Sequence, residues 1–153
     1  MSKSTQIIGA RLKRDDARGK TTGETKFLTD IKVDNMLHAA PVFSQVAYGK
    51  LLGIDTRVAE NDPDYIAFFS AKDIPGENQV GVILEDQPLM AADVVRYVGD
   101  SVGILIAETA EAAQRLARLV SVNIDPFDPV FSIDESRNAK VNLLHETNLA
   151  CQH

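Results

Sequence analysis

Apolar residues along the chain fall into short runs of strand length and one stretch of helical period. Five runs have the length and turn-rich borders of strands: residues 36–43, 50–54, 65–69, 101–107 and 120–126. Ala113, Leu116 and Val120 recur at the spacing of one helix face, so a helix is predicted over residues 109–119. Thr109 is the residue type that caps such a helix.

The order of these runs predicts an α+β domain. A second, brief helix is expected after Asp55 and Thr56, which can cap it. Long strand-rich stretches with only two helices favour α+β over a doubly wound sheet. Residues 101–107 are apolar on both faces, and the strand–helix–strand order that follows suits a right-handed crossover. Pro41 cannot donate to a ladder, which assigns its strand to a sheet edge or a bulge.

The remaining segments are polar or turn-forming. Residues 1–26 are predicted to be an extended arm. Residues 62–64 and 73–76 have the Pro, Gly and Asp content of turns. Residues 80–84 fit either a short strand or part of a loop.

Charge and cysteine content narrow the classes of function. The formal net charge is -6, and Asp15 and Asp16 interrupt the densest basic stretch, so no nucleic-acid partner is expected. No apolar run approaches the ~20 residues of a membrane helix, and no secretory signal is visible. The single cysteine, Cys151, excludes an internal disulfide and indicates a reducing compartment, so a cytoplasmic location is expected.

A search for catalytic chemistry finds no constellation. His38, His145 and His153 lack a second ligand at metal-site spacing, and Cys151 has no base in its local sequence. Residues 99–103 resemble a glycine-rich phosphate loop but precede a strand, so they are interpreted as a turn. The residues themselves therefore predict an α+β domain with no catalytic, cofactor-binding or metal-binding site.

Ordered short motifs nevertheless carry a family resemblance. They run through residues 9–125 as Gly9, Arg14-Asp-Asp-Ala17, Lys20-Thr-Thr-Gly23, Met36-Leu-His-Ala39, Ile54-Asp55, Asp73-Ile-Pro-Gly76 with Asn78, Ala92-Asp-Val-Val-Arg-Tyr-Val-Gly99, and Val122-Asn-Ile-Asp125. In this order they resemble the α/β-hammerhead domain that opens the molybdenum-carrying large subunit of the xanthine dehydrogenase/aldehyde oxidase family. The resemblance implies a hammerhead fold with a mixed sheet and two helices over residues 27–125. Residues 126–153 would form a linker toward cofactor domains.

The resemblance also implies a function. The complete enzymes hydroxylate heterocycles or aldehydes at a molybdopterin centre and pass electrons through [2Fe-2S] clusters, commonly to FAD. This chain would be a structural, subunit-interface domain without catalysis of its own. Its partners would be the molybdopterin-binding domains and the iron–sulfur and flavin subunits, with self-association into a homo-oligomer left open.

The resemblance also points to one substrate-contacting site, and one alternative function remains open beside it. By position after Asp73-Ile-Pro-Gly76, the resemblance assigns Val82 and Ile83 to the wall of the substrate funnel, although both also fit buried strand positions. The alternative function is a stand-alone, non-enzymatic binding or interaction module that keeps the hammerhead fold. A downstream reading frame carrying the cofactor motifs would separate the two.

Overall fold

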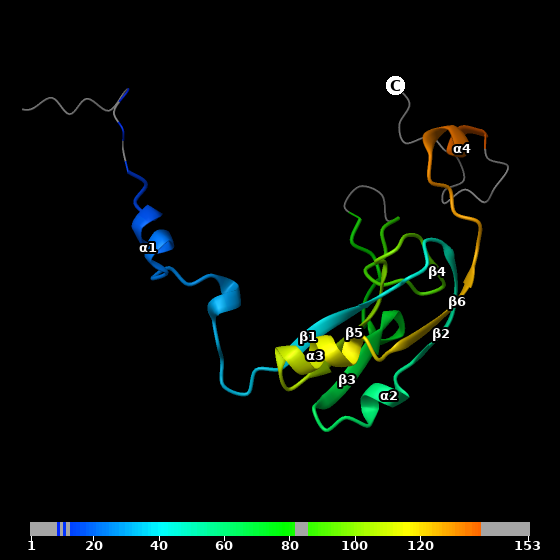
Figure 1. Cartoon of the computed structure of the whole chain (residues 1–153), viewed down its shortest axis with the longest axis horizontal. Coiled ribbons are helices and arrows are strands. Elements are labelled where there is room, and N and C mark those ends of the chain that lie inside the picture. Colours follow the sequence, from blue (N-terminus) through cyan, green and yellow to red (C-terminus); the bar gives the residue numbers. More distant parts are fainter. Residues whose placement is uncertain (1–8, 10, 12, 82–85, 139–153) are drawn as a thin grey trace, which may run out of the picture. The chain divides into compact units, whose positions relative to one another are not determined.

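The computed structural model describes residues 9, 11, 13–81 and 86–138, and the chain divides into two compact units, residues 1–36 and 37–153. The first unit has a short helix, α1 (Ala17–Thr22), and a 3-10 turn, η1 (Leu28–Asp30) (Figure 1). The helix corrects the expectation of an extended arm. Asp16 at its start accepts from Lys20 Nζ (2.6 Å) one turn later, and Gly23 ends it with φ +78°.

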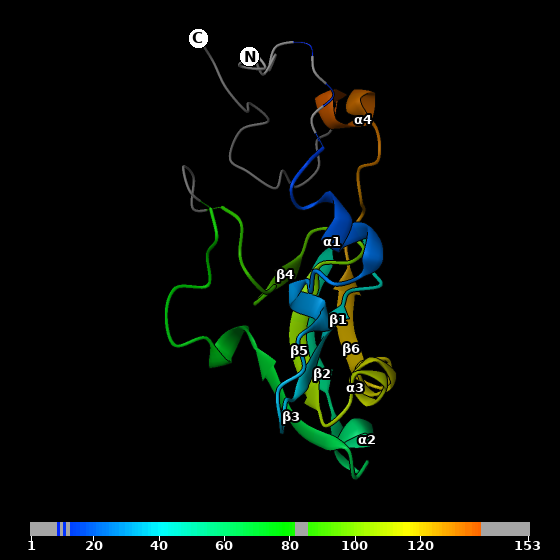
Figure 2. The same ribbon diagram turned by 90° about the vertical axis from the view of Figure 1, so that its left-hand side faces the viewer.

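In the described part of the second unit, six strands form two antiparallel sheets (Figures 1 and 2). Sheet A has the order β1 (His38–Phe43), β5 (Ser101–Ala107), β3 (Tyr65–Ser70). Sheet B has the order β4 (Val94–Val95), β2 (Gly49–Asp55), β6 (Ser121–Pro126). The helical elements are α2 (Arg57–Glu60), the 3-10 turn η2 (Ala71–Asp73), α3 (Ala110–Ala117) and α4 (Ile133–Asn138).

The predicted α+β class is confirmed, and the expected strands and both expected helices are present within a few residues of their predicted bounds. The arrangement of the strands differs from the expected mixed sheet, because every pairing among the described strands is antiparallel. The strand–helix–strand stretch is not a crossover either, since β5 and β6 belong to different sheets. Strand β1 lies at an edge of sheet A with a bulge after Val42, as Pro41 predicts.

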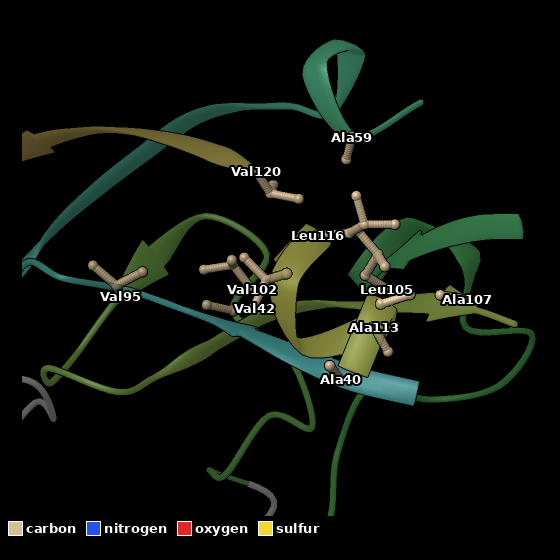
Figure 3. Close-up of a cluster of buried hydrophobic side chains, with 12 residues drawn as sticks. Ala40, Val42, Ala59, Val95, Val102, Leu105, Ala107, Ala113, Leu116 and Val120 are labelled. Carbon is tan, nitrogen blue, oxygen red and sulfur yellow. The ribbon is translucent and has the colours of Figure 1, made fainter. Parts of the chain in front are cut away.

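Helix α3 lies across β1 and β5 and closes the core (Figure 3). The Thr109 side chain accepts from Ala112 N (3.1 Å), which caps the helix as predicted. Leu116 is fully buried on its inner face, and Leu105 of β5 is fully buried beneath it. The full buried cluster is Ala40, Val42, Ala59, Ala91, Val95, Val102, Leu105, Ala107, Ala112, Ala113, Leu116 and Val120.

Sheet B turns its apolar side to this core. The pairs Leu51–Ile124 and Ile54–Val122 are half-buried and pack against the buried cluster. The opposite face of the same strands carries Lys50–Asp125, Gly53–Asn123 and Asp55–Ser121. Two apolar residues interrupt this polar set, namely Val94 of β4, which pairs with Lys50, and Leu52, which is 57% exposed at the bulge of β2. This is the pattern of an antiparallel sheet with one face in water.

Candidate functional site

The connection from β3 to β5, residues 71–100, holds the predicted site and the strongest family motif. Val82 and Ile83, the expected funnel residues, lie outside the described residues, as do His145, Cys151 and His153. Three sets of polar hydrogen bonds, here called anchors, hold the described parts of the connection on either side of residues 82–85.

The first anchor is Asp73. Its Oδ2 accepts from Ser70 N (2.7 Å) and Ser70 Oγ (2.9 Å), which caps η2. The donation from the Ser70 backbone, followed by its hydroxyl, holds the pKa of Asp73 below its ordinary value. Asp30 caps η1 in the same way by accepting from Phe27 N (2.9 Å). Both aspartates thus bond the backbone of their own turns.

The second anchor is Asn78, which pairs with the backbone of Met90. Asn78 Nδ2 donates to Met90 O (2.7 Å), and Met90 N donates to Asn78 Oδ1 (2.9 Å). Val80 N also donates to Gln87 O (2.9 Å). The amide side chain therefore acts as a short strand partner and brings the two stems that flank residues 82–85 together.

The third anchor is the corner formed by Ser44 and Asp100, the buried polar residues of the described chain. Asp100 Oδ2 accepts from Arg96 N (2.9 Å), and Ser44 N donates to Asp100 O (2.8 Å). Gly99 N donates to Ser44 O (2.9 Å), with Gly99 at φ +95°. The interpretation as a turn at the entry to a strand agrees with the structure, because Gly99 N and Asp100 N donate to the carbonyls of Ser44 and Tyr97 directly before β5 begins at Ser101.

The corner of Ser44 and Asp100 leaves part of the family motif, residues 92–99, exposed on the surface. Tyr97 and Val98 lie between the anchored residues Arg96 and Gly99 and are 57% and 61% exposed. Large apolar side chains held outward on an anchored loop are typical of a contact surface, because their exposure is costly without a partner. The sequence predicts the turn but contains no signal that Asp100 is buried, since its partners are backbone groups.

A cavity of about 530 Å³ lies between β2, β3 and the connection. Its lining residues come from β2, the start of α2, β3 and the connection: Leu51, Leu52, Gly53, Ile54, Thr56, Phe68, Ser70, Ala71, Lys72, Asn78, Ala91, Ala92 and Asp93. The walls are mainly apolar or small, with Lys72 and Asp93 as the charged groups. Such a lining suits packing or binding of an apolar group.

Metal-ligating side chains are dispersed in the described ranges. No group of three or more His, Cys, Asp or Glu residues there is arranged to hold a metal ion. His38 is half-buried on β1, in the row of Ala107 and Tyr65. None of the helices described in this chain is long and apolar enough to cross a membrane.

Comparison with known sequences agrees with this geometry. Residues 22–127 match the family described as aldehyde oxidase and xanthine dehydrogenase, a/b hammerhead domain. Xanthine dehydrogenase 1 of Arabidopsis thaliana is 41% identical over 125 residues, which are 81% of this chain and 9% of that protein. A probable xanthine dehydrogenase subunit of Bacillus subtilis is 34% identical, over 87% of this chain and 18% of its own length. The chain thus spans a small part of these relatives.

Solved structures show the same fold. The aldehyde oxidoreductase of Desulfovibrio desulfuricans superposes with a TM-score of 0.83 at 24% identity, over 92% of this chain and 17% of that one. The enzyme of Desulfovibrio gigas superposes with a TM-score of 0.81 at 23% identity, over 87% and 16%. From the family match and the identity to the plant and bacterial relatives, the chain belongs to the aldehyde oxidase and xanthine dehydrogenase family and contains its α/β-hammerhead domain.

Proposed function

We propose that this chain is the structural, subunit-interface domain of the large subunit of a molybdenum-dependent hydroxylase and has no catalytic activity alone. The observation that carries the proposal is the match of residues 22–127 to the hammerhead domain, within relatives of which the chain is only 9% to 18%. A relative from Eubacterium barkeri, 25% identical over 97% of this chain, is named as a large molybdopterin subunit. The contact surface at Tyr97 and Val98 supports an interface role.

The cofactors of the complete enzyme belong, in this proposal, to its other domains and subunits. Molybdopterin, [2Fe-2S] clusters and FAD would supply oxygen transfer and electron transfer there. The side chains of the described residues do not fit a metal centre, since they form no cluster of three or more ligands. A cytoplasmic location is part of the same proposal and rests on the single cysteine in the sequence.

Metal and cofactor analysis tests this division of roles. The purified chain should contain no stoichiometric molybdenum or iron and show no flavin absorbance, whereas the complete enzyme purified through a tag on this chain should contain molybdenum. Stoichiometric metal in the chain alone would contradict the non-catalytic role. A tagged chain that never co-purifies with molybdenum would contradict membership of a working hydroxylase.

Domain boundaries and partners complete the proposal. Residues 1–26 would serve as an N-terminal arm, residues 27–125 as the hammerhead domain and residues 126–153 as the linker to the molybdopterin-binding domains. The cavity of about 340 Å³ between Tyr97, Val98 and Phe131 supports this, since it lies where the chain leaves β6. Iron–sulfur and flavin subunits would be the redox partners of the assembled enzyme.

We assign Val82 and Ile83 to the wall of the substrate funnel of that enzyme. The support comes from their neighbours, because the Asn78–Met90 pair and the Val80–Gln87 bond hold the flanking stems at fixed positions. An apolar funnel wall is what a heterocyclic or aldehyde substrate requires.

In the assembled enzyme, Ile83→Ala should change the ratio of kcat/KM between a large and a small substrate and leave the unfolding midpoint unchanged. Leu116→Ala provides the matched comparison, because it should lower stability and leave the substrate ratio unchanged. If Ile83→Ala lowers stability and keeps the ratio, Ile83 is a core residue and the assignment is wrong.

A further inference from the structure

The face of sheet A turned away from α3 is apolar at each of the six positions in its two central rows. One row is Ala39, Ile106 and Ala67, and the next is Pro41, Ile104 and Phe69, each set by direct cross-strand pairing. Their neighbours along the strands, such as Ala40, Leu105 and Ala107, are buried under α3. Successive side chains of a strand point to opposite faces, so the six residues point away from the helix.

These six side chains are not part of the domain's own core. None of them is in the buried cluster or among the half-buried residues that pack on it. Ala39, Pro41 and Phe69 are exposed, with Phe69 at 47%, and the other three are half-buried. An antiparallel sheet with one face in water normally carries polar residues on that face, as β2 and β6 of sheet B do in the rows Lys50–Asp125 and Asp55–Ser121. A sheet that is apolar on both faces is normally covered on both.

We propose that this second face of sheet A is covered in the complete enzyme by the part of the large subunit that lies outside this domain. The inference rests on the proposed function and names the partner of the domain. In the Arabidopsis relative, the matching 125 residues are 9% of the protein, so most of that chain is available to pack on them.

The size of the face favours this partner over a second copy of the chain. Two rows across three strands occupy about 200 Å², from the spacing of strands and of residues along them. A stable complex of free proteins needs about 800 Å² per partner. Another domain of the same polypeptide would not have to overcome the full entropy of association, because a linker keeps its local concentration high.

Hydroxyl-radical footprinting tests the proposal, since it oxidises exposed side chains and mass spectrometry assigns the label to each residue. The free chain is compared with the molybdenum-containing enzyme purified from its own cells through a tag on this chain. Phe69 should lose label by about fivefold or more on assembly, as a side chain in an interface core does. Val58, which is 61% exposed on α2, provides the reference and should keep its label.

Each other outcome overturns the inference. Equal labelling of Phe69 in the free chain and in the enzyme shows that the face stays in water, while the proposed function stands. Protection in the free chain, together with a dimer by light scattering, makes a second copy the occupant. A purified assembly without molybdenum removes the proposed function, and the docking inference with it.

Substitutions give a second, independent readout. Phe69→Glu and Ala39→Glu place a carboxylate on opposite edges of the face, and Val58→Glu places the same charge on α2. All three positions are exposed, so each free chain should keep its circular dichroism spectrum. Assembly should fall about tenfold or more for the two face variants and remain unchanged for Val58→Glu, because a buried unpaired charge is costly at an interface. Face variants that assemble as well as Val58→Glu would overturn the inference.

Discussion

Sheets A and B each have three antiparallel strands and share one core, but the faces that they turn away from this core differ in polarity. Sheet B places Leu51, Ile54, Val122 and Ile124 toward the core. Its outer face is mainly polar and includes Val94 of β4 beside Lys50. Sheet A places apolar residues on both sides and covers only one of them with α3. The outer face of sheet B suits contact with water. The second face of sheet A suits contact with another domain, as proposed above.

The central strand of sheet A shows where stability and assembly separate. In β5, Leu105 and Ala107 are fully buried under α3, while Ile104 and Ile106 are half-buried on the other side. The first pair should determine the free energy of unfolding of the isolated chain. The second pair should matter mainly when the rest of the large subunit is present.

The largest effect is expected beneath α3. Leu116→Ala should lower the free energy of unfolding by about 2–5 kcal/mol, because it removes a fully buried side chain and leaves a cavity. Leu119→Ala is the control, since Leu119 is 42% exposed just beyond the helix and should cost about 1 kcal/mol or less. Urea unfolding of both variants measures the difference. Equal midpoints would show that α3 does not cover the core in solution.

How much of this arrangement the sequence predicts depends on the range of the contacts. The helical period of Ala113 and Leu116 and the cap at Thr109 are local signals, and the structure confirms them. The apolar character of both faces of residues 101–107 is also correctly predicted. The division into two sheets is not, because the pairing of β2 with β6 joins segments about 70 residues apart with no local signal.

The candidate site follows the same rule. The turn at Asp73 is predicted from its local composition, and the partner of Asp73 lies only three residues away. The Asn78–Met90 pair and the burial of Asp100 are not predicted, because one spans twelve residues and the other depends on backbone groups. Helix α1 is missed because a polar composition hides a single helical turn.

Glycines on the two sheets provide the next comparison. Gly103→Ala should lower the free energy of unfolding by about 1–3 kcal/mol, since a new Cβ would lie 2.7 Å from Phe69 O and 2.7 Å from Phe68 Cε2. Gly53→Ala on the outer face of sheet B should be neutral or slightly stabilising, because nothing lies within 4 Å of its Cβ position. Thermal unfolding compares the two. A stable Gly103→Ala variant would show that sheet A packs more loosely than described.

A smaller effect is expected on the uncovered face. Ile104→Thr should lower the stability of the free chain by about 1 kcal/mol or less, because its side chain is only half-buried. Val42→Thr makes a related change on the core side and should cost more, about 1–3 kcal/mol, since it buries a hydroxyl. Denaturant titration of both variants gives the ratio. If Ile104→Thr costs as much as Val42→Thr, the second face is already covered within the free chain.

The smallest effect concerns the ion pairs that join α3 to the turn before β3. Arg115 Nη1 lies 2.5 Å from Asp62 Oδ2, and Arg115 Nη2 lies 3.2 Å from Asp64 Oδ2. Hydrogen bonding from Arg115, followed by that from Asp64 N, holds the pKa of Asp62 below its ordinary value. A carboxyl group whose pKa is lowered by folding contributes stability above its unfolded pKa of about 3.9, and this contribution is lost as the pH falls through the folded pKa.

Arg115→Gln should therefore raise the pKa of Asp62 toward 3.8 and lower the unfolding midpoint at pH 6. The difference from the unmodified chain should shrink only as the pH falls below 3.8 through the lowered pKa of Asp62. The effect should be small because the arginine side chain is 50% exposed. Arg118→Gln is the matched control, since Arg118 follows the same helix and makes no ion pair within residues 86–138 or the other described segments. NMR titration of the Asp62 carboxyl group and midpoints at pH 6 and pH 3 measure both predictions. If the two variants behave alike at pH 6, the ion pairs do not hold α3 in place, and the covered face of sheet A depends on apolar packing alone.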